Sequence, residues 1–342
     1  MDQSLVLALQ KEFGIVDIIR IQHVELGYLT DNFIIHTAKN KKYFLKCQRN
    51  ETARILPFIE ETELFFAKNA IPVICPLQTK LGNAHFIHEV KTYTLYPFVL
   101  GTHIPRDELT KVHIQHFAQN LAHMHMLSKN GYPLVTACPV QDFWSKEKTL
   151  QGIIKIREIL AQKKSQDDFD RLTEESLTLK EKCIEQYAVV YSDTALMNDA
   201  LLHGDYHDYN IFFNSAGYVQ HISDFEKACW GSRMFEINKA MRISCFRFPF
   251  EEASYEKCMV FLRAYDEIYS VDIDELIRAC YERHYYSFHS LWFENEHYIL
   301  KNTRTDLLMP IELAKLKYFS QNIEIFARRI SHFRDSSNPT GQ

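Results

Sequence analysis

The chain has 342 residues, of which 46% are hydrophobic and 24% charged, and its formal net charge is −5. This length and composition are typical of a soluble globular protein of two domains, and they exclude disordered, fibrous and disulfide-scaffold proteins. A net negative charge gives no general attraction to nucleic acid or to an anionic membrane, so we expect neither as a partner.

The eight cysteines are scattered along the chain, and no two form a CxxC pair. The N-terminal apolar run is only five residues long, which is too short for an export signal. No uninterrupted apolar segment approaches the roughly 18 residues that a membrane span needs. We therefore expect reduced thiols and a cytoplasmic location.

The first 97 residues have the pattern of a small β-rich lobe. Short alternating runs predict strands, and two segments with helical spacing predict helices. The predicted strands are 18–26, 32–38, 42–48, 84–90 and 91–99, the helices are 4–13 and 57–70, and 81–83 is the predicted turn of the last hairpin. This order predicts a five-stranded antiparallel sheet with one helix inserted after the third strand.

From Gly101 onward the pattern becomes helical. Helices are expected at 107–129, within 145–200 and from about 249 to 333, with a loop-rich stretch at 201–230. The sequence thus predicts an α+β fold of two lobes, an N-terminal lobe of residues 1–97 and a mainly helical lobe of residues 98–342. Clefts between lobes are common ligand sites.

The most informative stretch contains His203-x-Asp205-x4-Asn210, followed by Asp224-Phe225-Glu226. Phosphoryl transfer from a nucleotide needs a carboxylate that accepts the proton of the attacking hydroxyl. It also needs an amide and a carboxylate that hold Mg²⁺ at the phosphates. Asp205 suits the first role, and Asn210 and Asp224 suit the second.

Apolar runs between Asn210 and Asp224 predict a hairpin that places both residues at the same end. A capping role in a loop is the ordinary alternative for an isolated Asp, but it does not account for the joint pattern. For His203 we expect a structural role that braces the loop.

The N-terminal lobe should contact the nucleotide. Lys46 ends an apolar strand and follows a turn at 27–31 that contains Thr30, an arrangement typical of a phosphate-covering loop and a phosphate-binding lysine. Its helical partner lies among Glu60, Glu61 and Glu63, and we choose Glu61. The backbone of residues 96–99, which include Phe98 and Val99, lies where the lobes join and is expected to hydrogen-bond adenine; packing in the core is the open alternative.

These residues resemble the aminoglycoside phosphotransferase and choline-kinase-like family of small-molecule kinases. Residues 203–210 match the family's H-G-D-x-H-x-x-N, and 222–226 match I-D-F/W-E except for the extra Ser223. Phe98-Val99-Leu100-Gly101 and Leu121-Ala122-x-Met124-His125 resemble its post-hinge and helical motifs. The resemblance implies a protein-kinase-like fold, ATP and Mg²⁺ as cofactors, and Asp205 as catalytic base.

It also implies transfer of the γ-phosphate to a hydroxyl of a small molecule, such as an amino sugar, an amino alcohol or an amino acid. Residues 56–58 and 71–76 look most like homoserine-kinase-type members, and a non-catalytic nucleotide-binding protein is the alternative from another class. Gly204 and Glu226 disfavour a protein kinase, which usually has Arg and Gly there. The acceptor, the choice of ATP or GTP, and the oligomeric state stay open at this point.

Overall fold

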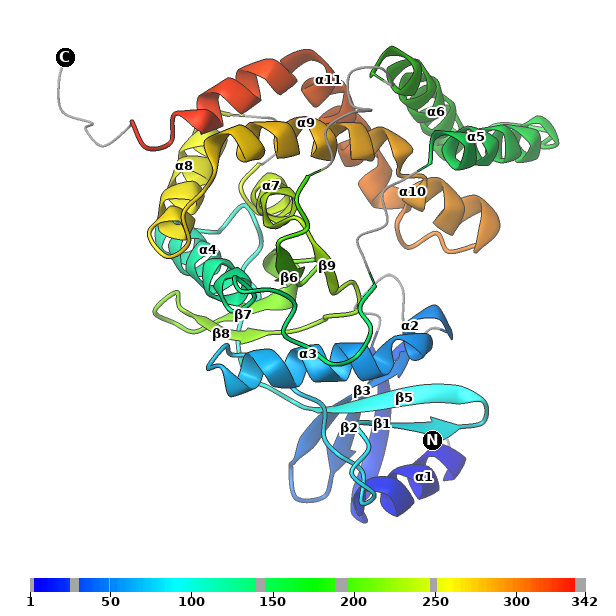
Figure 1. Cartoon of the computed structure of the whole chain (residues 1–342). Coiled ribbons are helices and arrows are strands. Elements are labelled where there is room, and N and C mark those ends of the chain that lie inside the picture. Colours follow the sequence, from blue (N-terminus) through cyan, green and yellow to red (C-terminus); the bar gives the residue numbers. More distant parts are fainter. Residues whose placement is uncertain are drawn as a thin grey trace. The chain divides into compact units, whose positions relative to one another are not determined.

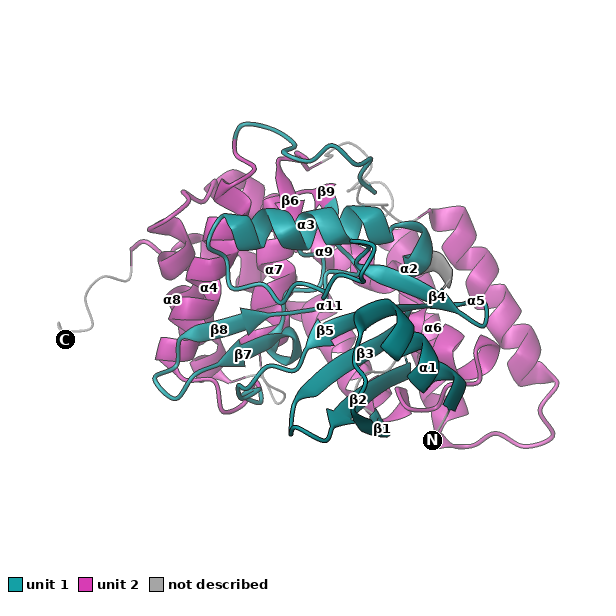
Figure 2. Ribbon diagram, turned by 90° about the horizontal axis from the view of Figure 1, so that it is seen from below, with its two compact units in different colours: residues 1–105, 130–139, 203–229 teal, residues 106–129, 140–202, 230–342 magenta. Residues whose placement is uncertain are grey.

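The computed structural model describes residues 3–24, 31–48, 50–139, 145–187, 196–246 and 251–335 (Figure 1). It divides into two compact units, coloured separately in Figure 2. The first comprises residues 1–105, 130–139 and 203–229, and the second comprises residues 106–129, 140–202 and 230–342.

The first unit is built on a five-stranded antiparallel sheet, as the sequence predicts. Its strands are β1 (Ile18–Val24), β2 (Asp31–Thr37), β3 (Lys42–Gln48), β4 (His85–His88) and β5 (Lys91–Pro97), in the order β1-β2-β3-β5-β4. Helices α2 (Asn50–Arg54) and α3 (Leu56–Lys68) follow the third strand. The predicted inserted helix is therefore confirmed as α3, and the short helix α2 precedes it.

The alternation of β3 decides which residues are available for chemistry. Tyr43, Leu45 and Cys47 are buried in a core with Leu5 and Leu9 of α1 (Gln3–Phe13). Because successive strand side chains point to opposite faces, Lys46 lies on the face that α1 does not cover.

One predicted turn is wrong. The β4–β5 hairpin turns at Glu89 and Val90, with φ of 47° and 61°, whereas Gly82 at φ 82° belongs to a separate turn before β4. Two consecutive left-handed residues match the twist of a two-residue hairpin. The sequence signal pointed to 81–83 because Gly and Asn adopt positive φ at low cost, which Glu and Val do not.

The hairpin of β7 (Ile211–Phe213) and β8 (Val219–Ile222) belongs to the first unit. The amide of Ile74 donates to Ile222 O at 2.9 Å, and Thr102 and Phe213 exchange backbone hydrogen bonds. These bonds explain why 203–229 groups with the N-terminal sheet, although it lies far along the chain. The contact-based division thus differs from the sequence boundary at 97/98, which stays a prediction.

The second unit is mainly helical, as expected. Its helices are α4 (Lys111–Met126), α5 (Lys146–Ala161), α6 (Asp168–Tyr187), α7 (Arg233–Ser244), α8 (Glu252–Asp266), α9 (Ile273–His289), α10 (Trp292–Glu294) and α11 (Met309–Ser331). A π-helical turn spans Asn295–Ile299, and 3-10 turns span Asp208–Asn210, in the first unit, and Asp306–Leu308. Strand β6 (Ala200–Leu202) pairs with β9 (Cys229–Gly231).

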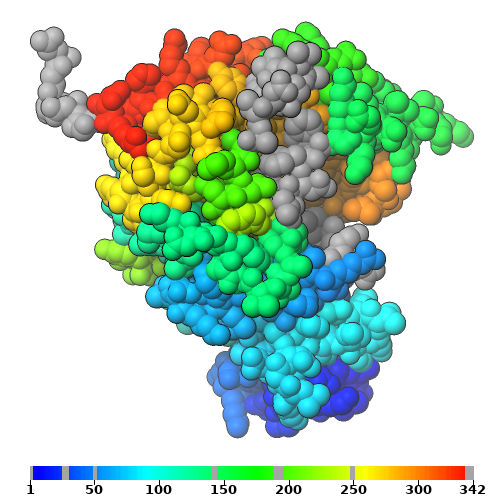
Figure 3. Space-filling model, viewed as in Figure 1, coloured from blue at the N-terminus to red at the C-terminus, as the bar shows by residue number. Residues whose placement is uncertain are grey.

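Helix α11 packs against both α8 and α9 in the second unit (Figure 3, yellow to red). Among the described residues, no helix combines the length and the apolar character needed to cross a bilayer.

Two buried histidines of α9 should make the protein less stable in mild acid. Burial lowers the pKa of His284 to about 3 and that of His289 to about 4. Below pH 6.5 the unfolded chain therefore binds protons that the folded chain does not, so the free energy of unfolding decreases as the pH is lowered. We expect each histidine to remove roughly 1 kcal/mol from the free energy of unfolding between pH 7 and 5.5.

Urea denaturation at these two pH values measures the loss. A His289→Gln variant should lose roughly 1 kcal/mol less than the wild type over the same interval, because one of the two groups is gone. An identical pH dependence in the variant would contradict the assignment.

Candidate phosphoryl-transfer site

His203 braces the loop that follows β6. Its ring is fully buried, donates from Nε2 to Ser223 O at 3.0 Å and accepts the amide of Asp205 at Nδ1. The ring also stacks on Phe225 with centroids 4.3 Å apart. The expected structural role of His203 is therefore confirmed, since it ties the Asp205 loop to the Asp224 segment.

Asp205 is held by a lysine that the sequence analysis did not single out. Its Oδ2 lies 2.7 Å from Lys227 Nζ and 3.7 Å from His207 Nε2. Lys227 is half-exposed and Asp205 largely buried, so the carboxylate is paired with a cation that solvent can reach. The only sequence signal was the position of Lys227 directly after Asp224-Phe225-Glu226.

The β7–β8 hairpin brings Asn210 and Asp224 together, as predicted. Ile211 pairs with Ile222, and Ser223 donates from both N and Oγ to Asn210 O. Asp224 follows at φ 70°, a conformation that costs a non-glycine residue energy and recurs at functional sites. Asn210 Nδ2 donates to Asp205 O at 2.9 Å, which ties the three residues into one cluster.

Lys46 joins this cluster from the sheet. Its Nζ lies 2.9 Å from Asp224 Oδ1 and 2.6 Å from Glu226 Oε1. Burial disfavours the charge of Lys46, but the two carboxylates outweigh it and raise the pKa of the ammonium. Burial likewise opposes ionisation of Asp224, yet Lys46 lowers the pKa of that carboxyl. The group is therefore a charged, mutually stabilised set.

The choice of Glu61 as partner of Lys46 needs correction. Both oxygens of Glu61 accept backbone amides, those of Val135 at 3.0 Å and Thr136 at 2.8 Å. Glu60 bonds instead to His85 Nδ1 at 2.7 Å.

Glu63 is the helical carboxylate in the field of Lys46. It is buried, accepts Tyr96 OH at 3.3 Å, and has a pKa raised well above its usual value by burial, against the opposing charge of Lys46. Glu63 lies four residues after Ile59 and three before Phe66, both buried, and this spacing could have identified it.

Phe98 and Val99 follow the end of β5, where Pro97 pairs with Tyr43. Phe98 lines a pocket of about 410 Å³ beneath the β2–β3 turn, whereas Val99 is not among its lining residues. Lys46 lies three positions after Tyr43 on β3, which places it roughly 10 Å from the pocket along the strand. The adenine contacts stay a prediction, and Thr30 lies outside the described residues.

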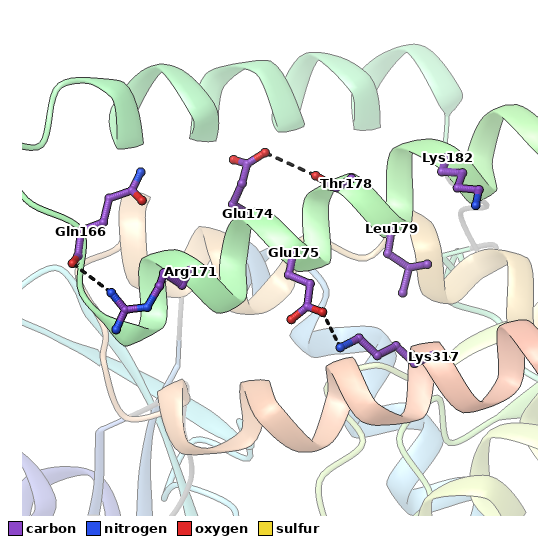
Figure 4. Close-up of a pocket in the computed structure, with 8 residues that line it drawn as sticks. All are labelled: Gln166, Arg171, Glu174, Glu175, Thr178, Leu179, Lys182 and Lys317. Carbon is purple, nitrogen blue, oxygen red and sulfur yellow. Dashed lines mark hydrogen bonds and ion pairs between the residues drawn. The ribbon is translucent and has the colours of Figure 1, made fainter.

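A second pocket, of about 540 Å³, lies between α6 and α11 in the other unit (Figure 4). Polar and charged side chains line it, and Glu175 pairs with Lys317 across it. None of the predicted site residues lines this pocket.

A family model described as the phosphotransferase enzyme family matches residues 20–274. The chain belongs to this phosphotransferase family. No curated protein sequence matches it significantly.

Solved structures share the fold at low identity. An amicoumacin kinase, hAmiN, in complex with AMP-PNP, Ca²⁺ and Ami is 13% identical with a TM-score of 0.65, covering 99% of this chain and 96% of that one. Spectinomycin phosphotransferase APH(9)-Ia, in complex with ADP and spectinomycin, is 14% identical with a TM-score of 0.66, covering 96% and 98%. A Plasmodium vivax ethanolamine kinase is 13% identical with a TM-score of 0.59, covering 96% and 91%.

The predicted family, the α+β kinase-like fold and the phosphotransferase class of activity are thus confirmed for this phosphotransferase.

The oxygen ligands at the end of the hairpin suit a divalent ion held together with phosphates. The described residues contain no group of three or more His, Cys, Asp or Glu side chains that would hold a metal by themselves. Mg²⁺ at phosphates needs only one or two protein ligands, and water and phosphate oxygens complete its shell. Because Asn210 Nδ2 is already a donor, its Oδ1 is the atom that would bind the metal beside Asp224.

Proposed function

We propose that this phosphotransferase transfers the γ-phosphate of ATP, with Mg²⁺, to a hydroxyl of a small molecule. The observation that carries the proposal is the convergence of Lys46, Asp205, Asn210 and Asp224 in one cluster, although 178 positions separate Lys46 from Asp224. A set of one cation, an amide and two carboxylates is what nucleotide-dependent phosphoryl transfer requires.

Each residue has a distinct role in this proposal. Lys46 binds phosphate oxygens, and Asn210 and Asp224 hold the metal. When bound, Mg·ATP supplies the phosphoryl group and the metal neutralises charge on its oxygens. Asp205 orients the acceptor hydroxyl and accepts its proton, while Lys227 holds the carboxylate in place. Glu63 and Glu226 keep Lys46 oriented.

The acceptor class follows the names of enzymes with the same fold. Amicoumacin, spectinomycin and ethanolamine appear in the names of three of them. We take an amino sugar, an amino alcohol or an amino acid as acceptor, with a homoserine-kinase-type metabolic role among these. None of the eight cysteines, all of which the structure describes, forms a disulfide, which supports action in the cytoplasm.

Two measurements test the proposal. ADP release across a panel of hydroxylated metabolites and aminoglycosides should identify at least one acceptor. No ADP release with any acceptor, despite nucleotide binding, would contradict a catalytic role.

The second measurement is thermal unfolding with and without Mg·ATP. A ligand at 100 times its Kd stabilises by about 2.7 kcal/mol, and Lys46→Met should lose most of this gain because the phosphate contact is gone. Lys68→Met, at an exposed position at the end of α3, is the matched control and should retain it. Equal stabilisation of both variants would contradict the role of Lys46.

A further inference from the structure

Positive charge gathers among helices of the second unit. The charge of Arg283 of α9 acts on Arg242 of α7. Both arginines, and Lys315 of α11, lie in the electrostatic field of one carboxylate, Glu312 of α11. Glu312 is already paired with Lys315 at 2.7 Å. One carboxylate therefore faces several cations, and its nearest charge is not Arg242.

Arg242 differs from other arginines of this unit. Its guanidinium lies over the Phe319 ring at 3.6 Å, and its Nη1 is buried with no hydrogen-bond partner. It forms no ion pair with any carboxylate of the described residues. Five other arginines of the unit pair with carboxylates: Arg157, Arg171, Arg233, Arg329 and Arg334.

The electrostatic setting of Arg242 is unfavourable without a ligand. Burial and the nearby charge of Arg283 lower its pKa to about 9. Arginine remains charged in proteins at neutral pH, so the group cannot escape by losing its proton. The side chain is partly exposed, but its Nη1 is buried, and a charge held partly out of water without an ion-pair partner is destabilising.

His284 adds a second buried polar group without a partner. Its ring is fully buried, and neither ring nitrogen has a hydrogen-bond partner. Burial lowers the pKa of the imidazole most, and the positive charges of Arg242 and Arg283 lower it further. His284 and Arg242 both pack against Phe319, with the imidazole centroid 6.5 Å from that ring. A neutral imidazole still offers one N–H donor.

An ordered water satisfies a neutral donor such as His284, but it does not neutralise Arg242. An oxyanion does both, because its oxygens accept hydrogen bonds and carry the missing charge. The planar fork of a guanidinium matches the paired oxygens of a carboxylate or phosphate.

We propose that Arg242, with Arg283 beside it, binds an anionic oxygen group, a carboxylate or a phosphate, of a small molecule. The group is either the carboxylate of a small hydroxylated molecule or free inorganic phosphate. Arg242 and Asp205 belong to different units, so the inference stands apart from the proposed function.

Thermal unfolding tests the site without any need for activity. Wild-type protein is titrated with inorganic phosphate, L-homoserine and L-serine, each against NaCl of equal ionic strength. At least one probe should raise Tm to a plateau. Arg242→Met should abolish that rise and should be as stable as the wild type without ligand, because it removes an uncompensated charge.

The choice of probe distinguishes a bound carboxylate from bound inorganic phosphate. A rise with L-homoserine or L-serine, but none with 3-aminopropanol or ethanolamine, which lack the carboxylate, identifies a carboxylate as the bound group. A rise with inorganic phosphate alone identifies free phosphate. Lys46→Met should keep the rise in either case, which distinguishes this site from the nucleotide site.

Arg329→Met is the matched control. Arg329 also lies 3.6 Å over an aromatic ring, that of Tyr255, but it pairs with Glu252. This variant should keep the ligand-dependent rise in full. If Arg242→Met does not fold, Arg242→Lys keeps the charge, loses the fork and should show a reduced rise. An equal rise in wild type and Arg242 variants, or no rise with any probe, would overturn the site.

Discussion

Replacing Asp205 by alanine is expected to lower kcat by about 10²–10⁴-fold and to leave nucleotide affinity nearly unchanged. In the proposed mechanism Asp205 accepts the proton of the acceptor hydroxyl, whereas Lys46, Asn210 and Asp224 contact the nucleotide and its metal. ADP release with an acceptor from the panel measures kcat, and the Mg·ATP-dependent rise in Tm measures nucleotide binding.

The variant should fold. Asp205 loses its ion pair with Lys227, but that lysine is half-exposed and its charge stays solvated. Asp205→Asn keeps the shape and the backbone bonds of the loop and should be as inactive as the alanine variant. Full activity in either variant would contradict the mechanism.

Replacing Gly204 by alanine is expected to lower kcat by at least about 10²-fold and to destabilise the protein. Gly204 has φ 79°, and a Cβ there would lie 1.8 Å from Lys227 O. That oxygen is backbone, so either the Asp205 loop or the segment after Asp224 must move. A displacement of about 1 Å is enough to cost 10²-fold in rate.

Gly82→Ala is the control for backbone strain alone. Gly82 has φ 82°, and a Cβ there would meet nothing within 4 Å. It should cost about 1–2 kcal/mol of stability and leave kcat unchanged. Urea denaturation and ADP release compare the two variants. Equal stability losses and equal rates would contradict a steric role for Gly204.

The catalytic set was predictable because its spacing is local. Asp205 and Asn210 are five positions apart, and the apolar runs before Asp224 made a hairpin the natural connection. Backbone bonds between Asn210 and Ser223 then produced the expected proximity. The sheet of the first unit was predictable for the same reason, since its strands alternate and are separated by short turns.

The partner of Lys46 was not predictable with the same certainty. Glu60, Glu61 and Glu63 occupy one helical turn, and each has a different partner: His85, the backbone at 135–136, and Tyr96. Those partners come from distant parts of the chain, so the only local signal is the spacing that puts Glu63 on the buried face of the helix with Ile59 and Phe66. The turn at Glu89 and Val90 escaped prediction because its residues carry no turn signal.

The sequence by itself determined the family, the α+β class and the candidate residues of the proposed chemistry, because spacing and side-chain type are local properties. The tertiary structure alone decided that Lys46 contacts Asp224 and Glu226, that Lys227 pairs with Asp205, and that Arg242 forms no ion pair with any described carboxylate. These are long-range facts of packing, in which burial removes water and leaves each charge to whatever group the fold places beside it.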